Sequence, residues 1–357
     1  MILNNTSEKI GVIGAGSFGS TIANILAEKS EVLIFARDRE EFAAIEKAGT
    51  SKRGHRFHEN VKPVASLEEM AESCRIIFPI VPSANFRSMI QDLSPFLKPY
   101  HLLIHGTKGI DIPFPDDIDH EVDRSKVKTM SEVIREETNV VRIGCLAGPN
   151  LATEIKDKQP AATVVASKFD EVIVSCKSLL RTPNFQIYGN EDLLGVEWAG
   201  ILKNAIAIAA GILVGVGYGD NAKALLLTRG MGEMIYLGNA LGADAKAFLG
   251  LAGIGDLIAT CNSKHSRNFT VGYRIAQGEQ LEKIIDDMDE VAEGVKTVKV
   301  AKLLSDHYEV PAPITQTLYR ILFSGLSVEK GIKFLMRYPA EIDADYVDFY
   351  RSTTFSR

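Results

Sequence analysis

Several features that would point to a class of function are scarce in this chain. The formal net charge of 357 residues is −6 at pH 7, which excludes the broad basic field that nucleic-acid binding usually requires. Phosphate can still be bound by a few local residues. Cysteines are few and widely spaced, so we expect reduced thiols and assign no redox or metal role to them: Cys74, Cys145, Cys176 and Cys261.

Long hydrophobic segments and clustered metal ligands are also missing. The longest apolar run, residues 205–216, falls short of the roughly 20 residues that cross a bilayer and predicts a buried helix. The first nine residues lack the pattern of a secretory signal, so we expect a cytoplasmic protein. His55 and His58 lie in a polar stretch without further ligands, which indicates a solvated loop rather than a metal site.

What is present is enough apolar sequence for two domains. The chain is 46% hydrophobic and 24% charged, which allows two ordinary hydrophobic cores. Strand-like apolar runs dominate before residue 194, and helical patterns dominate after it. We therefore predict an α/β domain over residues 1–193, with a Rossmann-like doubly wound sheet, and an all-α domain over residues 194–357.

A glycine-rich turn follows the first predicted strand. Gly14, Gly16 and Gly19 stand between a buried strand and an amphipathic helix. Gly14 allows the tight turn, Gly16 lets the backbone approach a pyrophosphate, and Gly19 lets the helix pack closely on the strand. The helix N-terminus then offers N–H groups to phosphates, so the unit predicts dinucleotide binding.

The residues after the second strand bear on the choice of dinucleotide. NAD sites usually carry an acidic residue there, whereas this chain has Arg37 followed by Asp38. Arg37 favours the extra phosphate of NADP. Two alternatives stay open, because Asp38 can still reach the ribose and Arg37 can stack on the adenine.

Further apolar runs predict the rest of a parallel sheet, at residues 76–81, 102–105, 141–146 and 162–166. Loops at the C-terminal ends of such strands line the ligand crevice. They include Lys108 in Gly-Thr-Lys-Gly and Gly148 in Gly-Pro-Asn. Residues 111–123 are rich in acid and proline, which predicts a solvated excursion.

Lys203 is the most informative residue of the predicted helical domain. It lies within an apolar stretch, and its helical neighbours at three and four positions include Ala199 and Ile206, so the lysine should point inward. The simple explanation is a lysine that snorkels to the surface or neutralises a buried carboxylate. The functional explanation is proton transfer, since burial without a partner would lower the pKa of the amine.

Two further clusters in the helical domain carry polar chemistry. Asp256 follows a glycine turn at a predicted helix start, where capping is the simple explanation. Ser266, Arg267 and Asn268 open another predicted helix. A guanidinium beside a helix N-terminus suits a phosphate, although a serine cap with a solvated arginine explains the same residues.

The motifs together resemble the bacterial-type NAD(P)-dependent glycerol-3-phosphate dehydrogenases. The resemblance covers residues 9–335 and depends on the glycine turn, Val-Pro-Ser at 81–83, Gly-Thr-Lys-Gly at 106–109, Gly-Pro-Asn at 148–150, Leu-Lys-Asn-Ala-Ile-Ala at 202–207, Gly-Leu-Ala-Gly-Ile-Gly-Asp at 250–256, Ser-Arg-Asn at 266–268 and Val-Ala-Glu-Gly-Val-Lys-Thr at 291–297. Asn150 departs from the serine or threonine common in the family. The excursion after Gly109 is longer than usual.

The resemblance implies a reaction and the roles of particular residues. It implies NAD(P)H-dependent, reversible reduction of dihydroxyacetone phosphate to sn-glycerol 3-phosphate for phospholipid synthesis, with a helical domain like that of 6-phosphogluconate dehydrogenase. The implied catalytic residues are Lys203, Asp256 and Lys108. The implied substrate ligands are Lys108, Gly148, Lys203, Asp256, Ser266, Arg267 and Asn268. The implied dinucleotide ligands are Gly14, Gly16, Ser17, Phe18, Gly19, Arg37, Lys108, Ala152, Arg267, Val291 and Glu293.

Two other functions remain as alternatives. One is a related hydroxy-acid dehydrogenase, in which a carboxylate replaces the phosphate. The other is a dinucleotide sensor without catalysis, against which the intact Lys203 and Asp256 argue. The apolar, glycine-rich helices also suggest a homodimer.

Overall fold

The computed structural model describes residues 8–112, 122, 124–288 and 291–338. Within these, residues 8–112 and 128–197 form one compact unit, here called the sheet unit. Residues 122, 124–127, 198–288 and 291–338 group into a second, here called the helical unit. Most of the acidic excursion lies outside the described residues, and the division at residue 194 stays a prediction.

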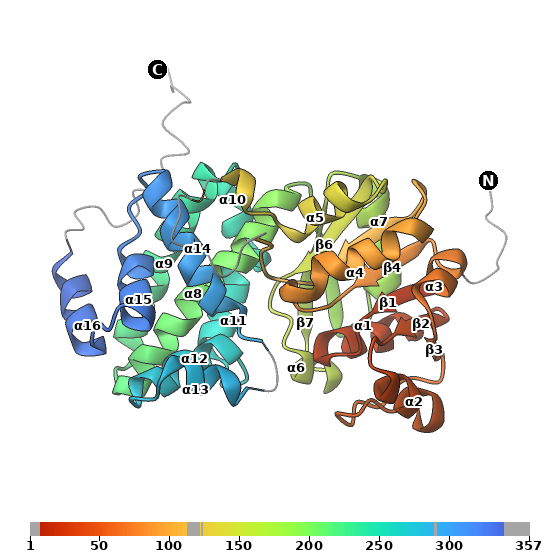
Figure 1. Cartoon of the computed structure of the whole chain (residues 1–357), viewed down its shortest axis with the longest axis horizontal. Helices are drawn as coiled ribbons and strands as arrows, with labels where there is room; N and C mark the ends of the chain where they lie inside the picture. Colours follow the sequence, from red (N-terminus) through yellow and green to blue (C-terminus); the bar gives the residue numbers. More distant parts are fainter. Residues whose placement is uncertain (1–7, 113–121, 123, 289–290, 339–357) are drawn as a thin grey trace, which may run out of the picture. The chain divides into compact units, whose positions relative to one another are not determined.

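The sheet unit is built on one eight-stranded sheet (Figure 1) with the order β3-β2-β1-β4-β5-β6-β7-β8. The order of its first six strands is that of a dinucleotide-binding fold, with the switch point between β1 and β4. The predicted α/β class is therefore confirmed. The strands are β1 Ile10–Ile13, β2 Val32–Phe35, β3 Val61–Val64, β4 Ile76–Pro79, β5 Leu102–His105, β6 Arg142–Ala147, β7 Ala161–Ser167 and β8 Phe185–Asn190.

The prediction that residues 162–166 continue a parallel sheet is wrong. β7 runs antiparallel to β6, with Gly144 opposite Ser167 and Ala147 opposite Val164. The connection contains only the five-residue helix α6 (Ala152–Lys156), about 7.5 Å long. A six-residue strand is about 20 Å long, so this helix covers less than half of the length that a parallel crossover helix spans. The C-terminal end of β7 therefore lies away from the C-terminal ends of β1 to β6.

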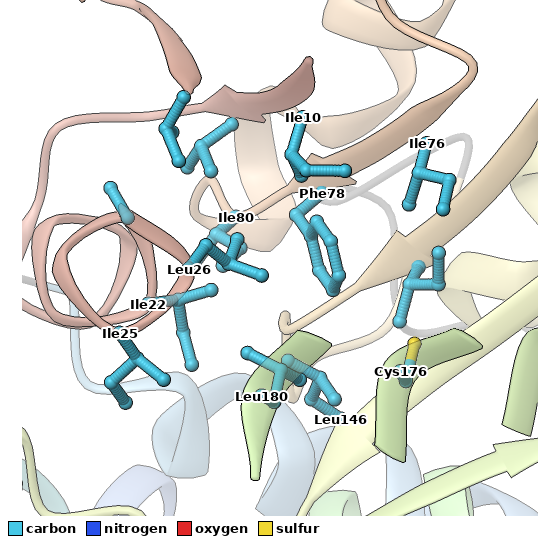
Figure 2. Close-up of a cluster of buried hydrophobic side chains, with 14 of the residues drawn as sticks. Ile10, Ile22, Ile25, Leu26, Ile76, Phe78, Ile80, Leu146, Cys176 and Leu180 are labelled. Atoms are coloured by element: carbon cyan, nitrogen blue, oxygen red, sulfur yellow. The ribbon is translucent and has the colours of Figure 1, made fainter. Parts of the chain in front are cut away.

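Apolar side chains from the strands and from helices that include α1 and α7 form the core of the sheet unit. Figure 2 shows Ile22 and Leu26 of α1 facing Phe78 of β4, with Leu180 of α7 beside Leu146 of β6. All five are at most 1% exposed. The helices of this unit are α1 Ser17–Ala27, α2 Arg39–Ala48, α3 Leu67–Ser73, α4 Phe86–Leu93, α5 Met130–Glu137, α6 Ala152–Lys156 and α7 Asp170–Leu180.

The helical unit contains helices only, within its described residues, as the sequence predicts for the second domain. A π-helical turn, Leu251–Gly255, runs directly into α11. The helices are α8 Leu193–Val216, whose first five residues belong to the sheet unit, α9 Asp220–Ala240, α10 Ala245–Phe248, α11 Asp256–Asn262, α12 Arg267–Ala276, α13 Leu281–Asp286, α14 Glu293–His307, α15 Pro313–Phe323 and α16 Val328–Arg337.

Helix α8 is long and apolar enough to cross a membrane by length and composition, but 72% of its apolar window is buried inside the protein. Its glycine positions explain part of that burial. A Cβ on Gly211 would lie 2.0 Å from the carbonyl oxygen of Phe269, and one on Gly272 would lie 1.9 Å from that of Ile208. Helices α8 and α12 therefore touch backbone to backbone, which only glycine permits. As predicted for residues 205–216, the segment is helical, and it is buried over most of residues 205–212.

Candidate functional site

The glycine turn has the conformation that its sequence predicts. Gly14 has a φ of +111°, and a Cβ there would lie 2.2 Å from the carbonyl oxygen of Ile80. A Cβ on Gly19 would lie 2.1 Å from the carbonyl oxygen of Gly14. No atom lies within 4 Å of the Cβ position of Gly16. Two of the glycines are thus required by the fold, and the third leaves open space beside the turn.

The N-terminus of α1 follows this turn. Gly16 is its N-cap in an extended conformation, and no side chain caps the helix. Ser17 is the first helical residue. The ring of Phe18 packs against Gly106, where a Cβ would lie 2.8 Å from Phe18 Cε1. The backbone N–H groups and the positive end of the helix dipole at this turn fit a pyrophosphate.

Arg37 and Asp38 differ in their surroundings. Asp38 is the N-cap of α2, accepts a hydrogen bond from the Glu40 N–H at 2.9 Å and pairs with Lys52 Nζ at 3.0 Å. These contacts, Lys52 first, lower the pKa of Asp38. Arg37 is exposed two residues after β2. Because both carboxylate oxygens of Asp38 have partners within α2 and its flanking loop, Arg37 is the better candidate for a contact with the adenosine ribose or its phosphate.

Lys108 and Gly148 come together although 40 residues separate them. Lys108 Nζ donates a hydrogen bond of 2.7 Å to the carbonyl oxygen of Gly148, which has a φ of +128°. The loops after β5 and β6 thus meet as parallel neighbouring strands predict. Asn150 turns its amide nitrogen to Thr163 Oγ1 at 2.9 Å. Ala152 follows as the first residue of α6.

A buried polar cluster in the sheet unit was not predicted. Glu197 accepts hydrogen bonds from Thr129 Oγ1 at 2.9 Å and from Ser131 N and Oγ at 2.9 and 2.5 Å. His105 Nε2 lies 2.9 Å from the same carboxylate, although without the alignment of a regular hydrogen bond. Burial raises the pKa of Glu197, but His105 and Ser131 outweigh burial and hold it below its usual value. Glu197 thus caps α5 and contacts the end of β5.

Lys203 lies buried in the helical unit, as the helical pattern predicts, and is 4% exposed. Its Nζ lies 3.3 Å from Asp256 Oδ1 and donates a hydrogen bond of 2.7 Å to Thr260 Oγ1. The Thr260 hydroxyl in turn donates to Asp256 Oδ1 at 3.1 Å. The three side chains form a closed triangle, which holds the ammonium between a carboxylate and a hydroxyl.

Two details of this triangle go beyond the sequence. Asp256 is not a helix cap, because the backbone is already helical at Gly255 (φ −62°, ψ −48°); its carboxylate contacts Lys203 instead. Thr260 was missed. The available signal was its position four residues after Asp256, which places both side chains on one face of α11.

Ser266, Arg267 and Asn268 form the first turn of α12. Ser266 is its N-cap and accepts a hydrogen bond from Phe269 N at 3.2 Å, so the capping explanation holds for that residue. Arg267 is exposed, and its Nη1 donates to the carbonyl oxygen of Val291 at 2.9 Å. Asn268 is buried, donates from Nδ2 to Asn204 Oδ1 at 2.9 Å and accepts from Gly294 N at 2.9 Å.

Val291 and Glu293 lie beside this turn of α12. Glu293 is the first residue of α14, and Val291 is held through its carbonyl oxygen by Arg267. The structure therefore brings Arg267, Val291 and Glu293 together within the helical unit. Across residues 8–112, 122, 124–288 and 291–338, no group of three or more His, Cys, Asp and Glu side chains is arranged to hold a metal ion.

Comparison with known proteins assigns the family. The model of the NAD-dependent glycerol-3-phosphate dehydrogenase N-terminus matches residues 9–173, and that of the C-terminus matches residues 192–333. The chain is 39% identical over 344 residues to glycerol-3-phosphate dehydrogenase (NAD(P)+) of Pseudomonas aeruginosa strain LESB58, which covers 95% of this chain and 97% of the relative. The corresponding protein of Staphylococcus aureus strain USA300 is 38% identical over 335 residues, covering 92% and 97%.

A solved structure agrees with these relatives. The crystal structure of glycerol-3-phosphate dehydrogenase from Coxiella burnetii is similar at a TM-score of 0.84 and 29% identity, covering 93% of this chain and 99% of that chain. The two family models together span most of the chain, and the relatives match it nearly end to end. This chain therefore belongs to the family of NAD-dependent glycerol-3-phosphate dehydrogenases.

Proposed function

We propose that the chain catalyses the reversible, NAD(P)H-dependent reduction of dihydroxyacetone phosphate to sn-glycerol 3-phosphate. The observation that carries this proposal is the buried triangle of Lys203, Asp256 and Thr260. Reduction of a ketone produces an alkoxide that needs a proton and a positive neighbour. A buried ammonium held by a carboxylate provides both. In the oxidative direction the neutral amine accepts the proton.

The dinucleotide supplies the hydride for the carbonyl carbon. The residues proposed to hold the dinucleotide lie at the glycine turn, near the ends of strands, or at and beside the first turn of α12. They are Gly14, Gly16, Ser17, Phe18, Gly19, Arg37, Lys108, Ala152, Arg267, Val291 and Glu293. The open space at Gly16 and the uncapped α1 N-terminus support the pyrophosphate site. The exposed Arg37 beside a capping Asp38 supports NADP over NAD.

The substrate phosphate is assigned to the N-terminus of α12. Arg267 is exposed at the first helical residue, where a guanidinium and the helix dipole attract an anion together. Ser266 and Asn268 flank it. Lys108, Gly148, Lys203 and Asp256 are the remaining proposed substrate ligands. Lys203 acts as the proton donor and acceptor, with Asp256 and Lys108 as the other catalytic groups.

The alternatives are weaker on specific grounds. A hydroxy-acid dehydrogenase would hold a carboxylate where Arg267 is placed, and family membership favours the phosphate substrate. The buried pair of Lys203 and Asp256, 3.3 Å apart, favours an enzyme over a sensor without catalysis.

Cellular context and assembly are also proposals. A cytoplasmic location and a role in phospholipid precursor supply follow from the family. A homodimer was suggested by glycine-rich helices, but Gly211 of α8 packs against α12 of the same chain. That support is therefore weaker than the sequence indicates, and light scattering of the purified protein decides the oligomeric state.

The test is oxidation of NADPH and, in parallel, of NADH by the purified protein with dihydroxyacetone phosphate, followed at 340 nm. We expect turnover with both and a higher kcat/KM with NADPH. Pyruvate and 2-ketopantoate serve as phosphate-free comparison substrates. Folded protein that binds dinucleotide but reduces only a keto acid supports the hydroxy-acid alternative, and the absence of turnover with every substrate supports the sensor.

A further inference from the structure

The amide of Asn268 joins three helices of the helical unit. Its side chain lies on the first turn of α12, its Nδ2 donates to Asn204 Oδ1 on α8, and its Oδ1 accepts from the backbone of Gly294 on α14. The orientation is dictated by chemistry, because a backbone N–H can only donate and must face the amide oxygen. Asn268 is 8% exposed and Asn204 is 4% exposed, so both bonds are shielded from water.

Gly294 is the residue that permits this arrangement. It is buried at the second position of α14, whose N-cap, Ala292, provides no side-chain cap. The Asn268 amide therefore caps α14 from another helix. A Cβ on Gly294 would lie 2.7 Å from the carbonyl oxygen of Asn204 and 2.7 Å from Asn268 Oδ1. Any side chain at position 294 must push α14 away from α8 and α12.

A second contact ties the same two segments together. Arg267, next to Asn268, donates from Nη1 to the carbonyl oxygen of Val291 at 2.9 Å. Residues 291 to 294 are thus held at both ends by the first turn of α12. Within the proposed function, this turn receives the substrate phosphate, and Val291 and Glu293 contact the dinucleotide. The first turn of α12 therefore holds the proposed phosphate site and also contacts the segment that is proposed to bind the dinucleotide.

We propose that Gly294 is a positioning residue that couples substrate phosphate binding to dinucleotide binding. This inference rests on the proposed function and extends it. An anion bound by Arg267 restrains the guanidinium that also holds Val291. Residues 291 to 294 are then already restrained in part when the dinucleotide binds. Each ligand stabilises the arrangement that the other requires, so binding of the two is positively cooperative.

The test is an equilibrium titration of NADPH, followed by its fluorescence, with and without saturating sn-glycerol 3-phosphate. Both ligands are reduced, so no turnover disturbs the measurement. In the wild type we expect the Kd of NADPH to fall at least about fivefold with sn-glycerol 3-phosphate and to stay unchanged with glycerol. Calorimetry should find the same factor for sn-glycerol 3-phosphate when NADPH is present, because linkage is reciprocal.

Two glycine variants separate coupling from general damage. The coupling factor is the Kd of NADPH without sn-glycerol 3-phosphate divided by its Kd with it. In Gly294→Ala we expect this factor to fall to within about twofold of one, whereas Gly219→Ala should keep the wild-type factor. Gly219 is a matched control, because it also lies at a helix N-terminus of the helical unit and its Cβ position is open. A wild-type factor near one overturns the inference, even if Gly294→Ala does not fold. A wild-type factor retained in folded Gly294→Ala overturns it as well.

The proposed function is judged separately by turnover of dihydroxyacetone phosphate. Wild-type turnover with a coupling factor near one removes only the coupling. Absence of both NADPH binding and turnover removes the proposed function and the coupling together.

Discussion

The sheet unit and the helical unit carry their candidate functional groups in different ways. In the sheet unit the turn before α1 works through its backbone, with glycine conformation and helix N–H groups as the working parts. In the helical unit the proposed catalytic group, the triangle of Lys203, Asp256 and Thr260, consists of buried side chains. Substitutions in the glycine turn should therefore affect dinucleotide binding without chemistry, and substitutions in the triangle should affect chemistry without dinucleotide binding.

The largest effect is expected at Lys203. Lys203→Ala should lower kcat about a thousandfold, because the proposed mechanism takes both proton transfer and charge stabilisation from this buried ammonium. The Kd for NADPH should change less than about threefold, since this amine serves the chemical step. Steady-state kinetics and a fluorescence titration on the same preparation measure both quantities.

The control for this variant is Lys223→Ala. Lys223 pairs at 3.3 Å with Asp220, whose side chain is almost fully exposed, and it should keep wild-type kcat. A Lys203→Ala enzyme within tenfold of the wild-type kcat removes Lys203 from the mechanism. Equal losses of turnover and NADPH binding would contradict the proposal that the triangle serves chemistry and the glycine turn serves dinucleotide binding.

The second effect tests the glycine turn with two neighbouring substitutions. Gly16→Ala places a methyl group in open space, so the melting temperature should not change while the Kd for NADPH rises about tenfold or more. Gly14→Ala meets the carbonyl oxygen of Ile80 in a left-handed conformation. It should lose about 1–3 kcal/mol of stability along with binding.

Thermal unfolding and NADPH titration distinguish these two variants. Gly16→Ala with wild-type affinity would mean that the pyrophosphate does not approach this turn. Turnover per bound dinucleotide should stay close to wild type in Gly16→Ala, which contrasts directly with Lys203→Ala.

The third effect concerns the hydroxyl in the triangle. Thr260→Val keeps the shape of the side chain but removes the group that bonds to both Lys203 and Asp256. We expect kcat to fall about tenfold, equivalent to roughly one lost hydrogen bond to a charged group, with little change in KM.

Thr228→Val is the matched comparison for this variant. Its hydroxyl bonds only to the carbonyl oxygen of Ala224, on the exposed part of α9. An unchanged kcat in Thr260→Val would mean that Asp256 alone orients the lysine.

The same contrast explains which parts of the fold the sequence predicts. The glycine turn and the long apolar helix are local patterns, and both form as expected. β3 was not predicted because Lys62 and Pro63 interrupt its apolar pattern, as edge strands allow. The antiparallel direction of β7 depends on what a short helix can span, which no pattern within the strand encodes.

The site divides along similar lines. The inward direction of Lys203 follows from helical periodicity, and its pairing with Asp256 was implied only by the family resemblance. Thr260 and the contact of Asn268 with Gly294 depend on how separate helices pack. Glu197 carried a signal that was overlooked, since it is a second charge in the helix that contains Lys203. Its partners, however, come from β5 and α5, far away in sequence.

The last effect is on stability alone and lies away from the triangle, at Glu233. This buried carboxylate accepts hydrogen bonds from Ile314 N and from the backbone and hydroxyl of Thr315, and so caps α15. Burial nevertheless raises its pKa to about 7. The folded state thus binds a proton more tightly than the unfolded state, so this group's contribution is complete below about pH 4.5 and is lost as the pH rises through 7.

Glu233→Gln should remove that dependence, so its stability should decline less between pH 5 and pH 8 than that of the wild type, by about 1–3 kcal/mol. Its stability should be lower than wild type at pH 5, because one glutamine oxygen replaces two acceptors. Urea unfolding at both pH values measures the change, and the exposed Glu282→Gln should retain the wild-type slope. An equal decline in Glu233→Gln would show that this carboxylate is ionised throughout the range. In that case the hydrogen bonds from the backbone N–H groups at the start of α15 would lower the pKa of Glu233 by more than burial raises it.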